Sequence, residues 1–182
     1  YDKIEDYVRA DAIFATNTSG LSINALSEVF PEGLKHRFCG VHFFNPPRYM
    51  HLVEIIATDK TDKSVVNSLT ELLTTTLGKG VVNAKDTPNF IANRIGVFSI
   101  LCTIYHGMKF NIPLETLDAL TGTLIGRAKS ATLRTADVVG LDTLNHTVNT
   151  MKNGLPEDPW QNHYQLPKWL LDLIEAGALG QK

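Results

Sequence analysis

Two side chains suited to acid–base chemistry stand at positions 42 and 54. His42 lies near the end of one expected strand, and Glu54 interrupts the apolar strand that follows. The prolines at 46 and 47 must break the first strand, because proline donates no hydrogen bond to a sheet. A chain that reverses there brings His42 near Glu54. A carboxylate on one imidazole nitrogen supports the positive charge that forms when the other nitrogen takes a proton. The pair predicts a general base; the alternative is a backbone-bonded histidine beside a solvent-facing glutamate.

Small polar side chains at two other places could meet a ligand. Residues 17–20 (NTSG) stand where an expected strand gives way to a helix. In doubly wound sheets, ligands bind outside the carboxyl ends of the strands, so Asn17 and Ser19 are candidates. Asn93 stands early in the first helix of the second half. The alternatives are ordinary turn chemistry for residues 17–20 and a solvated helix position for Asn93.

Residues 1–85 are expected to alternate between strands and helices, which is typical of an α/β fold. Short apolar runs predict the strands, the first of them as a buried strand of a parallel sheet. Apolar residues at helical spacing predict the helices, with Ser22 as one N-cap and Gly78 just beyond the end of another. The expected strands are 12–17, 38–44, 52–56 and 80–83, and the expected helices are the end of one over 1–9, then 22–29 and 62–77.

After the Asp-Thr-Pro sequence at 86–88 the pattern becomes purely helical. The spacing predicts helices over 91–105, after Pro113, over 141–151 and over 169–176, with no strand in residues 90–182. The sequence therefore divides into an α/β domain at 1–85 and an all-α domain at 86–182.

The overall composition excludes several classes of protein. The chain has 182 residues and a net charge of −2, which argues against nucleic-acid binding. No apolar run is long enough to span a membrane, and no signal peptide is visible, so a cytoplasmic location is expected. The two cysteines, Cys39 and Cys102, are expected to be reduced thiols. Cys39 and His42 lack further ligands at suitable spacing, so no metal site is expected.

Four segments, taken together, resemble the L-3-hydroxyacyl-CoA dehydrogenases of fatty-acid β-oxidation. They occur in the same order and at the same spacing as in that family, and HFFNP is the most specific of them. Residues 134–142 resemble part of the family's helical domain, and residues 179–182 (LGQK) resemble the start of a Gly-x-Lys-Thr-Gly element. The four segments are ATNTS at 15–19, HFFNPP at 42–47, LVE at 52–54 and KDTPNFIANR at 85–94.

The resemblance implies the C-terminal half of a Rossmann-like NAD-binding domain followed by a helical domain that forms a homodimer. On that mapping His42 is the base that removes the proton from the substrate 3-hydroxyl, and Glu54 pairs with it. Hydride from C3 passes to NAD, which gives the 3-ketoacyl-CoA. Ser19 and Asn93 would bind the acyl-CoA thioester substrate. The cofactor contacts implied by the resemblance are Asn17, Ser19, Asn45 and Lys182.

The sequence lacks the Gly-rich turn that cradles the phosphates of NAD in this family. Neither G-x-G-x-x-G nor the acidic residue that binds the ribose is present, so the 182 residues alone are expected to bind NAD weakly and to turn over slowly. Three alternatives remain open. The protein could oxidise a hydroxyacid that is not a CoA thioester, could be a non-catalytic helical dimerisation module, or could belong to a multifunctional β-oxidation protein.

Overall fold

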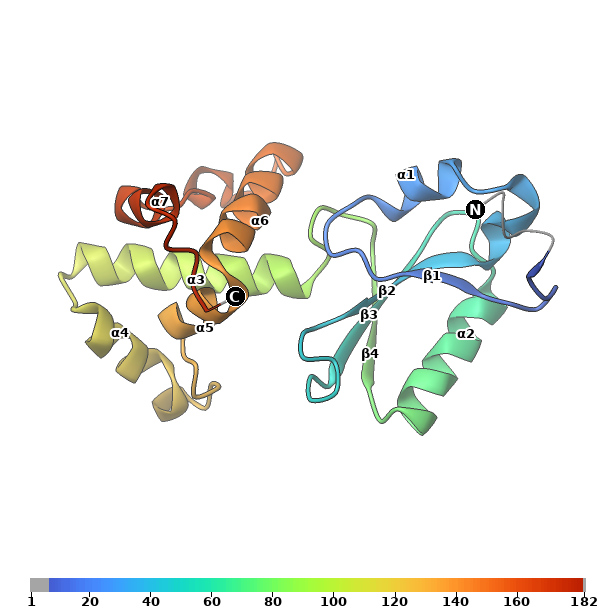
Figure 1. Cartoon of the computed structure of the whole chain (residues 1–182), viewed down its shortest axis with the longest axis horizontal. Helices are drawn as coiled ribbons and strands as arrows, with labels where there is room; N and C mark the ends of the chain where they lie inside the picture. Colours follow the sequence, from blue (N-terminus) through green and yellow to red (C-terminus); the bar gives the residue numbers. More distant parts are fainter. Residues whose placement is uncertain (1–6, 182) are drawn as a thin grey trace. The chain divides into compact units, whose positions relative to one another are not determined.

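The computed structural model describes residues 7–181, which form two compact units that divide after Ile91 (Figure 1). We call residues 7–91 the sheet unit and residues 92–181 the helical unit. The helix expected over residues 1–9 falls mainly outside the described residues, as does Lys182. The α/β half followed by an all-α half is confirmed, because among the described residues every strand lies in the sheet unit.

The sheet unit contains one four-stranded sheet in the order β1-β2-β3-β4. β1 runs parallel to β2, β2 is antiparallel to β3, and β3 is parallel to β4, so the sheet is mixed. The expectation for residues 12–17 needs correction: β1 has only three residues, stands at the edge of the described sheet, and is partly exposed. The other strands lie close to their expected positions. The bounds are β1 Phe14–Thr16, β2 Phe38–Phe43, β3 Leu52–Ala57 and β4 Gly80–Ala84.

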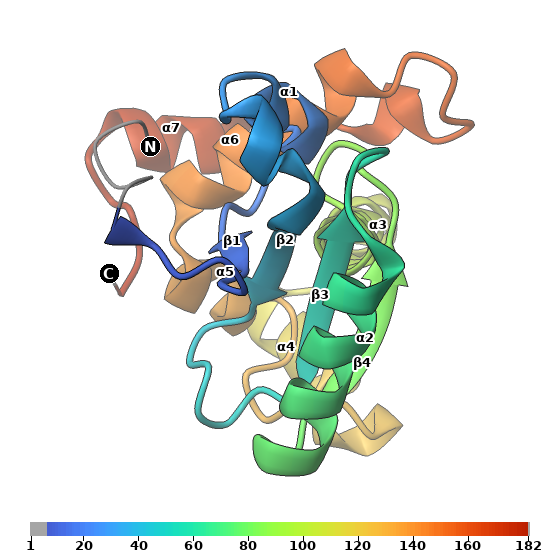
Figure 2. The same ribbon diagram turned by 90° about the vertical axis from the view of Figure 1, so that its right-hand side faces the viewer.

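Helices cover both faces of this sheet. α1 (Ile23–Glu28) begins at Ser22, whose hydroxyl accepts a hydrogen bond from the Ala25 N–H, as expected for an N-cap. A 3₁₀ helix, η2 (Glu32–Arg37), follows where only the end of a helix was expected. α2 (Lys63–Glu71) continues as a single π-helical stretch, η3 (Leu72–Thr76), before β4. Figure 2 shows α2 lying along the sheet on the face opposite α1.

Side-chain alternation along the strands divides the core of the sheet unit into two layers. Phe38 and Ile56 pack with α1 residues on one face, whereas Cys39 and Ile55 pack with α2 residues on the other. Since successive strand residues point to opposite faces, His42 and Glu54 belong to the face that holds Phe38 and Ile56. The face covered by α1 therefore carries the two candidate acid–base residues.

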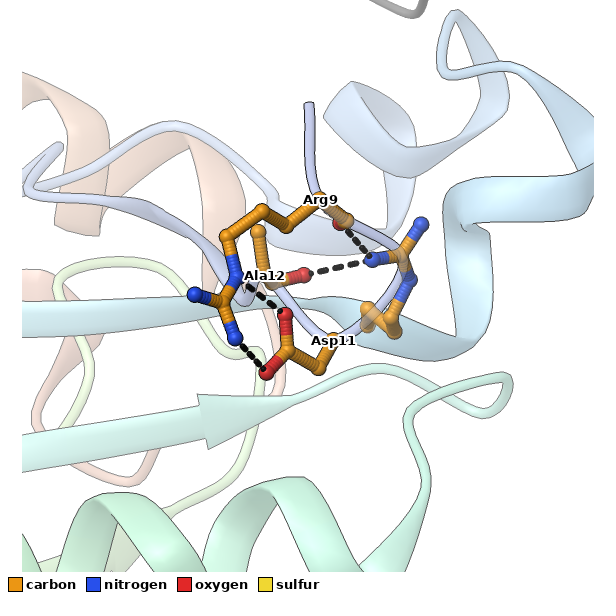
Figure 3. A network of polar contacts seen from close by, with 4 residues as sticks. Arg9, Asp11 and Ala12 are labelled. Carbon is orange, nitrogen blue, oxygen red and sulfur yellow. Dashed lines mark hydrogen bonds and ion pairs between the residues drawn. The ribbon is translucent and has the colours of Figure 1, made fainter. Parts of the chain in front are cut away.

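Polar contacts brace the segment that leads into β1 (Figure 3). The Arg37 guanidinium donates to the main-chain oxygens of Arg9 and Ala12 at 3.0 and 2.9 Å, and it lies over the Phe14 ring. Arg9 in turn makes a two-pronged contact with Asp11 at 2.9 and 2.7 Å. Arg37, which ends η2 next to β2, thus ties the entry of the edge strand to the neighbouring strand.

The helical unit is built on α3, which packs against α6. The helices expected after Pro113, over 141–151 and over 169–176 are confirmed within a few residues. α5 and the two short 3₁₀ helices were not expected. The bounds are α3 Ala92–Lys109, α4 Leu114–Thr121, η4 Thr123–Ile125, α5 Leu133–Val139, α6 Leu141–Gly154, η5 Gln161–His163 and α7 Lys168–Glu175.

Its core is one apolar cluster from α3, α6 and α7. Ile104 of α3, with Leu144 and Val148 of α6, is almost completely buried, and Leu170 of α7 completes the cluster. Burial of this apolar stripe accounts for α6 and α7, which have no side-chain cap hydrogen bond.

Candidate active site

His42 and Glu54 form a buried ion-pair geometry in the middle of the sheet unit. They are direct cross-strand partners in the antiparallel β2–β3 register, which brings their side chains within reach of each other. His42 Nδ1 lies 2.8 Å from Glu54 Oε2, and the two side chains are 3% and 1% exposed. The chain reversal predicted at the prolines is thus confirmed, and a solvent-facing glutamate is excluded.

Glu54 has a second partner that sequence reasoning missed. The Ile91 main-chain N–H donates to Glu54 Oε1 at 3.0 Å. Each carboxylate oxygen therefore has a polar partner, which is what a buried charge requires. The two contacts also hold the carboxylate plane, so that Glu54 presents Oε2 to the imidazole in one orientation.

Two phenyl rings pack around the imidazole. The His42 ring lies 4.5 Å from the Phe44 ring and 5.5 Å from the buried Phe90 ring, the latter in an edge-on arrangement. Apolar walls of this kind exclude water and strengthen the interaction of His42 with Glu54. Phe44 belongs to the HFFNPP motif, and Phe90 to KDTPNF, so both rings stand inside segments that the sequence singles out.

The turn after β1 is anchored beside His42. Asn17 Oδ1 accepts a hydrogen bond from the Phe43 N–H at 2.9 Å, which joins the carboxyl end of β1 to the residue that follows His42. Ser19 lies two residues farther along this turn and is exposed. This segment is therefore a turn, and its Asn17 end also lies beside the candidate base.

The remaining candidate residues are Asn45, Asn93 and Lys182. Asn45 is exposed in the loop after β2, two residues beyond the Asn17 contact. Asn93 is half-buried in the first turn of α3, which is part of the helical unit. Lys182 lies outside the described residues.

The turn at 87–91 explains how Ile91 reaches Glu54. The Phe90 N–H donates to the Thr87 oxygen, and Asn89 and Phe90 have φ angles of 60° and 51°. Left-handed backbone is tolerated by asparagine but costly for a bulky residue such as phenylalanine, where it persists because the surroundings hold it. The turn chemistry of Asp-Thr-Pro-Asn is visible in the sequence, but its contact with Glu54 is not.

Within residues 7–181, no group of three or more histidine, cysteine or acidic side chains could hold a metal ion. Both cysteines are free thiols, Cys39 buried and Cys102 partly buried. Among the described helices, none is long and apolar enough to cross a membrane. The pair of His42 and Glu54 is thus the strongest candidate for chemistry. With Nδ1 held by a carboxylate, the imidazole can accept a proton at Nε2.

The chain matches two family models. Residues 1–87 match the family model described as "3-hydroxyacyl-CoA dehydrogenase, NAD binding domain", and residues 90–182 match the one described as "3-hydroxyacyl-CoA dehydrogenase, C-terminal domain".

Curated relatives and solved structures point the same way. The chain is 43% identical over its whole length to a probable 3-hydroxyacyl-CoA dehydrogenase of Deinococcus radiodurans, of which it covers 52%. It is 41% identical over 98% of its length to a probable 3-hydroxyacyl-CoA dehydrogenase of Bacillus subtilis, of which it covers 23%. The crystal structure of the Mycobacterium tuberculosis protein FadB2 matches 96% of the chain with a TM-score of 0.82 and 33% identity, over 59% of that chain. The chain thus spans about half or less of the length of these two curated relatives.

Proposed function

Because the chain belongs to the 3-hydroxyacyl-CoA dehydrogenase family, we propose that it carries the general base of an NAD-dependent dehydrogenase acting on L-3-hydroxyacyl-CoA. The product would be the 3-ketoacyl-CoA, as in fatty-acid β-oxidation. The observation that carries the proposal is the buried His42–Glu54 contact of 2.8 Å, together with the hydrogen bond from the Ile91 N–H to the other carboxylate oxygen of Glu54.

In this proposal His42 moves the proton. Nδ1 carries its hydrogen toward Glu54, so the lone pair of Nε2 accepts the proton of the substrate 3-hydroxyl as the C3–H bond breaks. The resulting imidazolium is stabilised by the carboxylate, whose own position is held by the Ile91 N–H. Phe44 and Phe90 keep the ring dry and oriented.

Bound NAD supplies the acceptor for the hydride that leaves C3. The residues present fit its nicotinamide end: Asn17, Ser19 and Asn45 lie at or beyond the carboxyl ends of β1 and β2, where ligands of such sheets bind. Asn17 Oδ1 already accepts a hydrogen bond from the Phe43 N–H, so its contribution to a cofactor would be the amide NH₂. Lys182 remains a proposed contact outside the described residues. The sequence offers no Gly-rich turn for the pyrophosphate.

The substrate contacts are proposed as hydrogen bonds that orient the reacting group. Ser19 donates from the turn after β1, and Asn93 donates from the first turn of α3, toward the 3-oxygen or the thioester region. Such donors stabilise negative charge that develops on the oxygen as the proton leaves.

A homodimer formed through the helical unit is part of the proposal. Its support is the apolar surface that this unit exposes on α3 and around η4. Monomeric proteins rarely leave large contiguous apolar patches exposed. The exposed residues include Ile95, Met108, Phe110, Leu124 and Ile125. Sedimentation of the natural protein tests the dimer. We also propose a cytoplasmic location.

The test compares substrates on the longest natural polypeptide that contains this chain and on the 182 residues alone. NADH formation is followed with L-3-hydroxybutyryl-CoA and with free L-3-hydroxybutyrate. We expect the natural polypeptide to oxidise the thioester and the 182-residue chain to do so far more slowly, because it lacks the Gly-rich turn. Oxidation of the free acid alone would move the function to a non-CoA hydroxyacid. No oxidation of either would leave a non-catalytic module.

A further inference from the structure

Asp86 binds the beginning of α1 with both carboxylate oxygens. Oδ1 accepts from the Ile23 N–H at 2.9 Å. Oδ2 accepts from the Ser22 hydroxyl at 2.8 Å and from the main-chain and side-chain nitrogens of Asn24 at 2.8 and 2.9 Å. The aspartate is more than sixty residues away from these partners, so the contact joins two distant parts of the sheet unit.

Asp86 holds the residues at the start of α1, which directly follow the turn with Ser19. That turn is pinned at its other end by Asn17 on the Phe43 N–H, beside His42. In between, Gly20 lies against the 87–91 turn: a Cβ at Gly20 would come 2.9 Å from Asn89 Oδ1. Asn89 itself is buried. The two turns therefore touch where Asp86 joins them.

The segment that follows Asp86 supplies a hydrogen-bond donor to Glu54. Five residues after it, the Ile91 N–H donates to Glu54 Oε1 at 3.0 Å, through the left-handed turn at Asn89 and Phe90. Asp86 thus stands between the turn that carries Ser19 and the turn that orients the partner of His42.

We propose that Asp86 is a positioning residue of the dehydrogenase site, which holds the Ser19 turn and the Ile91 donor in register with the His42–Glu54 pair. The inference rests on the proposed function for its link to catalysis. A displacement of about 1 Å in such a site can cost up to ~10²-fold in rate.

The chemistry of Asp86 requires a carboxylate. Partial burial acts to raise its pKa, but the hydrogen bonds from Asn24, Ile23 and Ser22 outweigh burial and hold the pKa below its usual value. In Asp86→Asn, one oxygen would become an NH₂ group facing other donors, which breaks the contacts while the size of the side chain is kept.

The helical unit provides a matched control. Asp118 caps α5 in the same way, accepting main-chain N–H bonds from Thr132, Leu133 and Arg134 at 3.1, 2.6 and 3.0 Å. Asp118→Asn removes a comparable helix cap without touching either turn of the candidate site. Any general cost of losing a cap is measured by this variant.

The kinetic test uses the natural polypeptide that oxidises L-3-hydroxybutyryl-CoA. We expect Asp86→Asn to lower kcat by about tenfold or more with a change in KM below about threefold, Asp86→Glu to restore part of it, and Asp118→Asn to leave kcat within about twofold. In a Ser19→Ala background, Asp86→Asn should lower kcat less than it does in the wild type, because the part of its effect that acts through the Ser19 turn is already lost. A kcat for Asp86→Asn within twofold of the wild type, or fully additive effects with Ser19→Ala, overturns the proposal.

A second measurement does not depend on activity and keeps the two proposals distinct. Hydrogen exchange is followed in peptides that span residues 86–91. We expect Asp86→Asn to speed exchange there by about tenfold or more, and Asp118→Asn to leave it unchanged. Unchanged exchange in Asp86→Asn overturns the positioning role. If the wild type oxidises no hydroxyacid while the exchange result holds, the proposed function fails and the joining of the two turns stands.

Discussion

The sheet unit and the helical unit differ in where they bury polar groups. Among the described residues, seven polar or charged residues are buried, and only Thr132 lies in the helical unit. The buried core cluster of the helical unit consists of aliphatic side chains together with Met151 and Tyr164. A buried polar group is costly unless it is partnered, and the sheet unit holds the one buried acid–base pair found among the described residues. The six in the sheet unit are Ser27, Lys35, His42, Glu54, Thr58 and Asn89.

The same helix-capping chemistry serves different ends in the two units. Asp118 accepts hydrogen bonds from the start of a helix that begins about fifteen residues later, and these contacts stay within the helical unit. Asp86 reaches back more than sixty residues and joins two turns beside a buried acid–base pair. The two aspartates therefore differ in what they join: Asp118 caps one helix, whereas Asp86 links the start of α1 to the turn at 87–91.

The largest expected effect comes from removing the base in the sheet unit. His42→Gln should lower kcat for L-3-hydroxyacyl-CoA by about 10³-fold while KM changes little, since general bases typically contribute ~10²–10⁴-fold. His146→Gln, an exposed change on α6 of the helical unit, is the control. Steady-state kinetics of both variants measure the difference in kcat. Near-normal turnover of His42→Gln would show that His42 is not the general base.

A smaller loss is expected when the carboxylate beside His42 is neutralised. Glu54→Gln keeps the shape but loses the charge that stabilises the imidazolium, and its NH₂ must face either His42 Nδ1 or the Ile91 N–H. We expect kcat to fall by about 10²-fold. Glu115→Gln, exposed in α4, serves as the matched change in the helical unit. Equal activity of the two variants would contradict the pairing role.

The helical unit should respond mainly in stability. Leu144→Ala empties a site that is 2% exposed in the α3–α6–α7 core, and we expect the free energy of unfolding of this unit to fall by about 2–5 kcal/mol. Leu171→Ala, at a position 36% exposed on α7, should cost much less. Denaturant unfolding measures both. A loss below about 1 kcal/mol for Leu144→Ala would show that the core is not packed as described.

The two cysteines give the mildest contrast between the units. Burial raises the pKa of the Cys39 thiol to about 11, so at pH 8 only about one molecule in a thousand carries the reactive thiolate. Cys102 in the helical unit is partly exposed. We expect iodoacetamide to label Cys102 first and Cys39 only after unfolding. Peptide mapping by mass spectrometry checks the order, and early labelling of Cys39 would contradict its burial.

Much of the fold follows from local patterns. The strands at 38–44, 52–56 and 80–83 and the helix capped by Ser22 could be predicted, because short apolar runs and caps are local features. α5 could not, since its N-cap hydrogen bonds come from Asp118, fourteen residues earlier, and not from its own sequence. The partial exposure of β1 was also missed, because an apolar run does not reveal whether a strand stands at an edge.

The candidate site divides in the same way. The residue pattern is enough to predict a histidine and a glutamate on either side of a proline-broken reversal, and polar residues after the first strand. The burial of the glutamate, the hydrogen bond from Ile91 to its second oxygen and the contacts of Asp86 with the start of α1 are visible only in the folded chain. Strand periodicity and turn preference act over a few residues, whereas these hydrogen bonds join groups dozens of residues apart and exist only after the sheet has formed.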